Sequence, residues 1–142
     1  MRLKYFEEIA NQEFSTDCPY NNAEDRTIDT AFRFTSSDPS NNNNYLPNFI
    51  TDQPSRINTI DDSKKCSLFA LSMFSSLDKA VKRLNSLPEN IITKKGFTHI
   101  SVAKITKGMG LSTTPEKSGH FDFFEFEGTD IAGVFQIAFE RE

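Results

Sequence analysis

The stretch from Cys66 to Leu87 constrains the fold more than any other, because an apolar run leads directly into an amphipathic segment. The run at 68–74 reads LFALSMF and contains one polar residue, Ser72. A short run without a polar face is typical of a strand that is covered on both sides. We therefore expect residues 68–74 to form a strand deep within a sheet.

A helix is predicted to follow this strand at once. Ser75 or Ser76 offers a side-chain oxygen to cap it, and Asp78 places a carboxylate at the positive end of the helix dipole. Pro88 is expected to end the helix. The apolar residues recur at three- and four-residue spacing and mark the buried face: Leu77, Ala80, Val81, Leu84 and Leu87.

Further elements follow from the same kinds of pattern. Residues 3–14 are predicted to form a short helix. Segments with the alternation or the β-branched composition of strands are 30–35, 99–105, 121–127 and 134–139. Segments rich in turn-forming residues are predicted to be loops: 15–29, 90–96 and 111–119. The last two strands are expected to be antiparallel neighbours, with Phe135, Ile137 and Phe139 on one face.

These elements predict the α+β class, with a mixed or mainly antiparallel sheet of about five strands and one principal helix packed on it. A chain of 142 residues with 37% hydrophobic residues has the size of one domain, residues 1–142, and its 14 phenylalanines are expected to build the core. The Asn-rich segment 36–65 is longer than most connections. We expect a long loop that either hides short helical turns or has a function.

Charge and composition narrow the partners and the location. The net charge of −4 disfavours nucleic acid, whose phosphates attract clustered cations. No apolar stretch is long enough to span a membrane, and the first residues carry acids where a signal peptide needs an apolar run. A cytoplasmic protein is therefore predicted. Cys18 and Cys66 lack metal-ligand spacing, and both a buried thiol and a disulfide are compatible with them.

The segment 120–127 interleaves four phenylalanines with four ionisable residues: His120, Asp122, Glu125 and Glu127. Strict alternation would bury charge on either face, which is costly. One bulge at Phe123 or Phe124 would bring the four ionisable groups to one face, and this bulge is predicted. Such a row suits acid–base chemistry or a divalent cation, although a polar edge that keeps the strand from aggregating is the simpler interpretation. No metal site is predicted, because no second His or Cys completes one.

Two residues elsewhere are candidate site residues. Arg33 alternates with Phe32 and Phe34, so its side chain is expected to point away from them, where it suits solvent, a phosphate or a carboxylate. Ser72 lies in the buried run, where a nucleophilic role would need a nearby base. No motif of the common hydrolase, nucleotide-binding or metalloprotease types occurs.

The order of several short motifs resembles a group of small bacterial proteins of unassigned function. These motifs are FRF at 32–34, Cys66 with ALSMFSS at 70–76, GHFD at 119–122 with EG at 127–128, and FQI at 135–137. The resemblance implies a cytoplasmic bacterial domain and no particular activity. With its acidic and Asn-rich surface, the chain is predicted in the first place to be a protein-binding module.

The chain also resembles the ADP-ribosyltransferase-like fold. In those domains an Arg or His on the first strand holds the pyrophosphate of NAD, an apolar strand ending in Ser or Thr leads into a helix, and an acid on a late strand acts on the nicotinamide ribose. The resemblance implies that Arg33 binds the phosphates, that Ser72 lies at the site, and that Glu125 or Glu127 stabilises positive charge on the ribose. The Tyr pair of that family is absent here.

Two functions are therefore carried forward: a protein-binding module, and an NAD-using transferase or glycohydrolase. Geometry separates them: the enzyme is supported if Arg33, Ser72 and either Glu125 or Glu127 line one cleft, and it is excluded if they lie on opposite faces. His120 and Asp122 complete the candidate catalytic residues.

Overall fold

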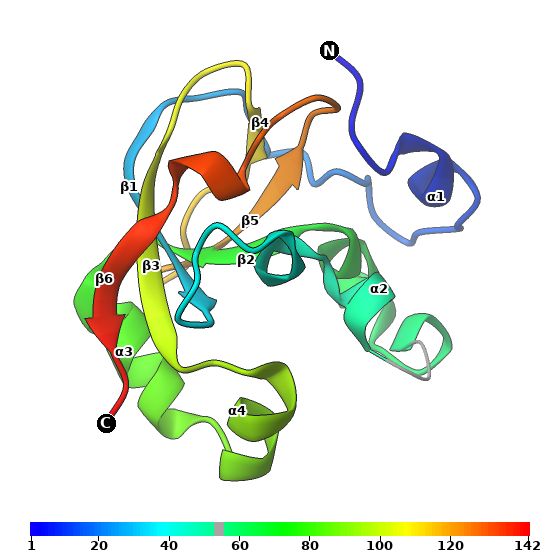
Figure 1. The fold of residues 1–142 in the computed structure, drawn as a ribbon. Helices are drawn as coiled ribbons and strands as arrows, with labels where there is room; N and C mark the ends of the chain where they lie inside the picture. Colours follow the sequence, from blue (N-terminus) through cyan, green and yellow to red (C-terminus); the bar gives the residue numbers. More distant parts are fainter. Residues whose placement is uncertain (53–55) are drawn as a thin grey trace.

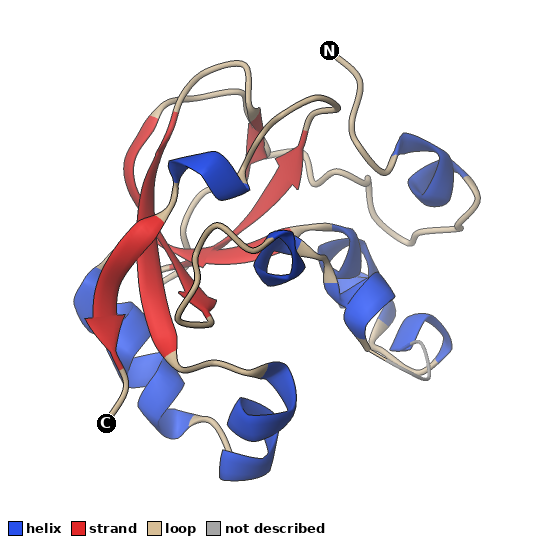
Figure 2. Cartoon of the chain, in the orientation of Figure 1, coloured by secondary structure: helices blue, strands red, loops and turns tan. Residues whose placement is uncertain are grey.

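Six strands form one antiparallel sheet, and helices and helical turns surround it (Figures 1 and 2). The computed structural model describes residues 1–52 and 56–142. In chain order the strands are β1 (Ile28–Thr35), β2 (Leu71–Phe74), β3 (His99–Ile105), β4 (Gly110–Ser112), β5 (His120–Glu125) and β6 (Gln136–Glu140). Their order across the sheet is β4-β5-β2-β1-β3-β6. The α+β class is confirmed, with six strands rather than about five, and β2 lies inside the sheet as predicted.

The helices are short apart from α3. The α-helices are α1 (Phe6–Ala10), α2 (Asn48–Thr51), α3 (Leu77–Ser86) and α4 (Glu89–Lys95); the 3-10 turns are η1 (Asn42–Tyr45), η2 (Arg56–Asn58), η3 (Asp62–Phe69) and η4 (Ala132–Val134). The Ser76 side chain caps α3 by accepting a hydrogen bond from the Lys79 N–H at 3.3 Å, close to the predicted start. None of the described helices has the length and apolar composition needed to cross a membrane.

Both faces of the sheet are buried, each in its own cluster. On one face, side chains of β1, β2 and β3 pack against α3 and α4: Phe32, Phe34, Phe74, Ile100, Ala80, Leu84 and Ile92. On the other face, the sheet packs against η1 and η4 through Leu71, Met73, Ala103, Phe121, Phe123, Tyr45 and Ala132. Phenylalanine thus supplies much of the core on both faces, as the composition predicts.

The sheet is narrowly joined at its centre. The register between β1 and β2 consists of the single pair Phe32 and Phe74, whereas β1 and β3 stay paired along most of their length. Away from that pair the Arg33 side chain bridges the two strands, because its Nη1 donates to the Ser72 carbonyl oxygen at 2.8 Å. The Arg33 side chain thus replaces the backbone hydrogen bonds that join neighbouring strands elsewhere in the sheet. The candidate site lies where β1 and β2 separate.

The prediction that the apolar run at 68–74 forms one strand was wrong. The first part of the run belongs to η3, and only Leu71–Phe74 forms β2. Long-range links hold η3 in place. Among them, a disulfide joins Cys66 to Cys18, with 5.5 Å between their Cα atoms, and Ser67 Oγ donates to Asp122. An apolar run fits a helical turn as well as a strand, so these distant partners decide the outcome.

Two predicted loops contain regular structure. Residues 90–96 lie largely in α4, which starts after Pro88 and ends at Gly96, whose φ of 73° is left-handed. The predicted loop 111–119 begins within β4, which pairs with β5. The long segment 36–65 does hide short helical turns, one of the two alternatives, and its residues 53–55 lie outside the described ones. The helix expected at 3–14 is limited to α1.

Two predictions for the last two strands were wrong: they are not neighbours in the sheet, and the first of them has no bulge. β5 pairs with β2 and β4, whereas β6 pairs with β3 at the far edge of the sheet. The register of β5 is regular, without a bulge at 123 or 124. The pairing of β3 with β6 does have an irregularity, where Ile137 pairs with Ser101 and Phe139 with Ile100. These two side chains of β6 therefore lie on opposite faces, not on one.

Candidate functional site

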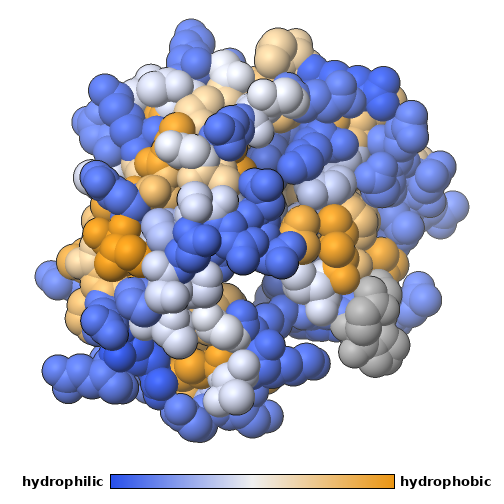
Figure 3. Space-filling view, viewed as in Figure 1, coloured by the Kyte–Doolittle hydropathy of each residue, from blue (hydrophilic) through white to orange (hydrophobic). Residues whose placement is uncertain are grey.

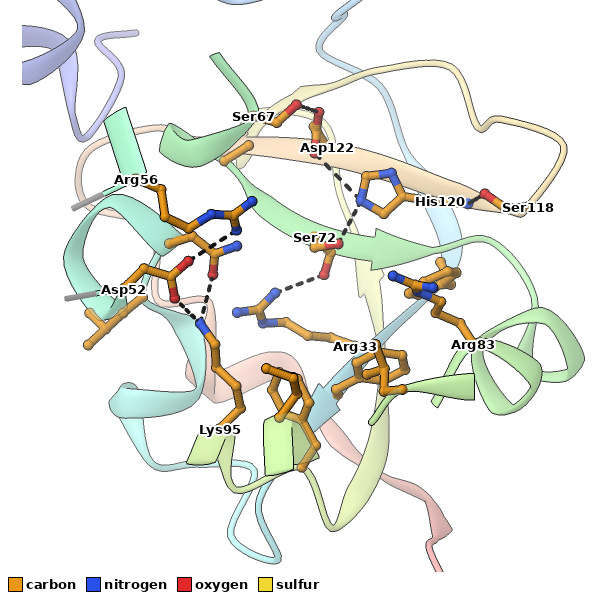
Figure 4. A pocket seen from close by; sticks show the side chains of 18 of the residues that line it. Arg33, Asp52, Arg56, Ser67, Ser72, Arg83, Lys95, Ser118, His120 and Asp122 are labelled. Carbon is orange, nitrogen blue, oxygen red and sulfur yellow. Dashed lines mark hydrogen bonds and ion pairs between the residues drawn. The ribbon is translucent and has the colours of Figure 1, made fainter. Parts of the chain in front are cut away.

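A cavity of about 820 Å³ opens where β1 and β2 separate. Figure 3 shows a hollow between α2 and α4 with largely hydrophilic atoms around its mouth, and Figure 4 shows the side chains inside. Its apolar wall consists of Phe34, Leu46, Ala70, Phe74, Leu87, Ile91 and Phe97. The polar side chains on its floor are Arg33, Ser67, Ser72, His120 and Asp122. A cavity of this size with a few convergent polar groups is typical of a ligand site.

Strand pairing brings three of the candidate residues together. Ser72 of β2 lies directly opposite Asp122 of β5, so both side chains project from the same face. His120 is two residues before Asp122 and shares that face, and its Nε2 lies 2.6 Å from Ser72 Oγ and 3.7 Å from Asp122 Oδ1. Gly119, with a φ of 84°, makes the turn that starts β5 at His120. His120 and Asp122 precede positions 123 and 124, so this grouping does not depend on whether the expected bulge is present.

This grouping is not the triad of a serine hydrolase. In such a triad the serine and the carboxylate bind different ring nitrogens of the histidine. Here Ser72 Oγ and Asp122 Oδ1 both face His120 Nε2. The arrangement therefore supports a carboxylate and an imidazole that act side by side on something in the cavity.

Asp122 is the buried acid of the site. Asp122 is 7% exposed, and its Oδ2 accepts a hydrogen bond from Ser67 Oγ at 2.7 Å. Tyr20 lies behind Ser67, with 2.9 Å between the two hydroxyl oxygens. Burial raises the pKa of Asp122, while the Ser67 hydrogen bond and the charge of His120 act in the opposite direction. Keeping an acid in this position costs stability, which is typical of functional sites.

Arg33 is the central cation of the floor. Its Nε donates to the Asn44 carbonyl oxygen at 2.9 Å and its Nη1 to that of Ser72, and its guanidinium lies 5.9 Å from the Tyr45 ring centroid. Burial lowers the pKa of Arg33 to about 10, against the opposing charges of Tyr45 and Glu125. The group stays protonated at neutral pH. In the described part of the chain no carboxylate pairs with it, so its charge is available to an anion.

Cations also surround the mouth of the cavity. Lys95 and Arg56 both bind Asp52; burial would raise the pKa of this acid, but the two cations lower it. Arg83 and Lys94 line the cavity without an ion pair to any described residue. Counting Arg33, five cationic side chains stand against three acidic ones, those of Asp52, Glu116 and Asp122. The cavity therefore favours an anionic ligand although the whole chain carries a net charge of −4.

The two glutamates predicted as catalytic lie elsewhere. Glu125 projects from the opposite face of β5, where its carboxylate is buried, lies 3.6 Å from Lys4 Nζ and accepts no hydrogen bond from any described residue. Burial raises its pKa, and Lys4 opposes that rise. Glu127 is exposed and pairs with Arg2 at 2.9 Å. The prediction that the four ionisable groups form one row is thus wrong. His120 and Asp122 line the cavity, and Glu125 and Glu127 do not.

The sequence patterns did not predict several of the residues that line the cavity. The helix α4 was interpreted as a loop, so Ile91, Lys94 and Lys95 were not expected beside a site. The cue was present in Pro88 and Gly96, which delimit a short helix. Within residues 1–52 and 56–142, no group of three or more His, Cys, Asp or Glu side chains is arranged to hold a metal ion.

Comparisons with known proteins give no match to any family model, any curated protein or any solved structure.

Proposed function

We propose that this protein is an enzyme that binds NAD and cleaves the bond between nicotinamide and ribose. The observation that carries the proposal is the convergence of Arg33 from β1, Ser72 from β2 and Asp122 from β5 on one cavity. The resemblance to the ADP-ribosyltransferase-like fold requires a cation on the first strand, a serine on the strand before the helix, and an acid on a late strand. Glu125 and Glu127 do not line the cavity, so the enzyme in the form first expected, with one of them acting on the ribose, is excluded. The proposal assigns that role to Asp122 instead.

The cavity has the chemical features that a dinucleotide needs. Arg33, Arg83 and Lys94 offer charge-assisted hydrogen bonds to a pyrophosphate. The rings of Phe34, Phe74 and Phe97 provide an apolar wall for a planar base or for nicotinamide. Its volume of about 820 Å³ lies within the range of pockets that enclose small molecules.

The chemistry follows from the position of the acid. When the glycosidic bond breaks, its electron pair leaves with the nicotinamide nitrogen, and positive charge develops on C1′ of the ribose. The carboxylate of Asp122, buried beside His120, stabilises that charge more strongly than an exposed acid would. Asp122 must be ionised for this role, and its raised pKa means that the rate should fall as acid conditions protonate it.

A thermal-shift titration with NAD tests the proposal. A ligand that binds the folded state at 100 times its dissociation constant stabilises it by about 2.7 kcal/mol. We expect Arg83→Gln to weaken NAD binding about tenfold, the loss of one charge-assisted hydrogen bond. The matched control is Arg141→Gln, which removes an arginine that pairs with Glu89 outside the cavity. No stabilisation by NAD would reject the enzyme and leave the protein-binding module as the remaining candidate.

The location of the protein belongs to the same proposal. The sequence predicted a cytoplasmic protein. However, Cys18 and Cys66 form a disulfide, and disulfides form and persist mainly in oxidising compartments. This bond favours a site of action outside a reducing cytosol. Titration of free thiols in protein taken from its native source, before and after reduction, distinguishes the two locations.

A further inference from the structure

The imidazole of His120 is the one strong candidate base beside the acid of the site among the described residues. Its Nε2 lies 2.6 Å from Ser72 Oγ and 3.7 Å from Asp122 Oδ1, so the imidazole and the carboxylate face the same part of the cavity. The ring stands edge-on to Phe74, with 5.6 Å between centroids, which fixes its plane. The Nδ1 atom forms no hydrogen bond to any described residue, so the ring has a nitrogen through which a proton can leave.

We propose that the acceptor in the NAD reaction is water and that His120 is the general base that activates it. This inference rests on the proposed function and names its second substrate. The stabilising acid and the base lie two residues apart on one strand, so they act on the same carbon atom from fixed positions. A catalytic imidazole of this kind contributes about 10²–10⁴-fold to a rate.

Access to the acid favours water over a side chain of another macromolecule. The side chain of Asp122 is 10% exposed and that of His120 is 27% exposed. Ser67 of η3 and Ala70, which ends η3, line the cavity next to them, and the disulfide at Cys66 fixes this segment. An acceptor has to reach C1′ of a ribose seated against this largely buried acid, and water is the smallest acceptor that can do so.

The proposed step balances as a hydrolysis. The bond between C1′ and the nicotinamide nitrogen breaks, and its electron pair stays on that nitrogen. A bond forms between C1′ and the oxygen of water. This oxygen passes its proton to Ser72 Oγ, and Ser72 Oγ passes its own proton to Nε2 of His120, with which it is in contact at 2.6 Å. The proton then passes to solvent, so NAD and water give nicotinamide, ADP-ribose and one proton, with no redox change.

Product analysis on the full chain tests the inference. The protein is incubated with NAD that carries a label in its adenosine part, and nicotinamide, free ADP-ribose and protein-bound label are measured. We expect nicotinamide and free ADP-ribose in equal amounts, with no label on protein. If NAD is consumed but the label enters protein, the inference is overturned while the proposed function stands. If NAD is neither bound nor consumed, both are overturned.

Substitution of the base gives a second and independent readout. We expect His120→Ala to lower kcat about 10²–10⁴-fold with KM for NAD nearly unchanged, and added imidazole to restore part of the rate. The matched control is His99→Ala, because His99 lies at the start of β3 and does not line the cavity. A His120→Ala variant that is folded, as judged by circular dichroism, and hydrolyses NAD at the wild-type rate would overturn the role of His120. Lost activity without rescue by imidazole would also count against it.

Discussion

At the scale of single residues, the chain keeps two carboxyl groups buried on opposite faces of one strand. Asp122 has Ser67 as a hydrogen-bond donor, whereas the carboxylate of Glu125 accepts no hydrogen bond from a described residue and lies 3.6 Å from the Lys4 ammonium. Burial raises the pKa of both acids. A group whose pKa is raised on folding binds its proton more tightly in the native state, so the free energy of unfolding falls as the pH rises through its titration. Both acids therefore cost stability at neutral pH.

We expect Glu125→Gln to stabilise the protein at neutral pH, because the neutral amide removes the cost of a buried charge. Below the ordinary pKa of a glutamate both forms are neutral, so the difference in unfolding free energy should vanish there. Urea unfolding at several pH values measures this. Glu127→Gln is the control: its exposed pair with Arg2 should change stability by less than about 1 kcal/mol at any pH. A lower stability of Glu125→Gln at neutral pH would show that the Lys4 pair outweighs burial.

We expect Asp122→Asn to leave the fold intact and to be at least as stable as the wild type at neutral pH. The amide oxygen can still accept the Ser67 hydrogen bond at the Oδ2 position, while the buried charge is gone. Thermal unfolding at neutral and at acid pH checks this. A fall in stability at neutral pH would indicate that Asp122 is held for structure, through its charge, and not for chemistry.

At the scale of elements, η3 is the segment that connects the disulfide to the acid of the site. Its residues Cys66 and Ser67 are neighbours in the chain, and they bind Cys18 and Asp122 respectively. The sequence could not reveal this. The apolar run at 68–74 predicted a strand, and the partners that turn its first part into η3 are 48 and 55 residues away. By contrast α3 was predicted almost to the residue, because its cap and its apolar spacing are local.

We expect the double variant Cys18→Ser, Cys66→Ser to lose stability by about 4 kcal/mol, since the disulfide closes a loop with a sequence separation of 48 residues. Because η3 then loses its anchor, Ser67 should hold Asp122 less firmly and turnover of NAD should fall as well. Urea unfolding and rate measurements on the same samples check both effects. Unchanged stability would mean that the bond does not form in the native protein.

At the scale of the whole molecule, the sheet consists of β4-β5-β2 and β1-β3-β6, which meet at the pair of Phe32 and Phe74. The site lies at this junction, and Arg33 serves both the junction and the cavity. The sequence predicted that Arg33 points away from Phe32 and Phe34, and the register agrees. It did not predict that Arg33 is half-buried, because that depends on the separation of β1 from β2, which no local pattern encodes.

We expect Arg33→Met to lower the free energy of unfolding by about 1–3 kcal/mol, since the carbonyl groups of Ser72 and Asn44 both lose their donor. Arg141→Met, which removes a surface pair with Glu89, should cost less than about 1 kcal/mol. Chemical denaturation of the two variants compares them directly. Equal, small losses would mean that Arg33 does not join the two halves of the sheet.

The release of nicotinamide from NAD by the wild type and by Asp122→Asn is the measurement that decides whether the junction of the sheet is a catalytic site. We expect the wild type to release nicotinamide, and the folded variant to do so about 10²–10³-fold more slowly, the usual loss when one electrostatic stabiliser of a transition state is removed. Equal rates for the two proteins, or no release by the wild type, would contradict it.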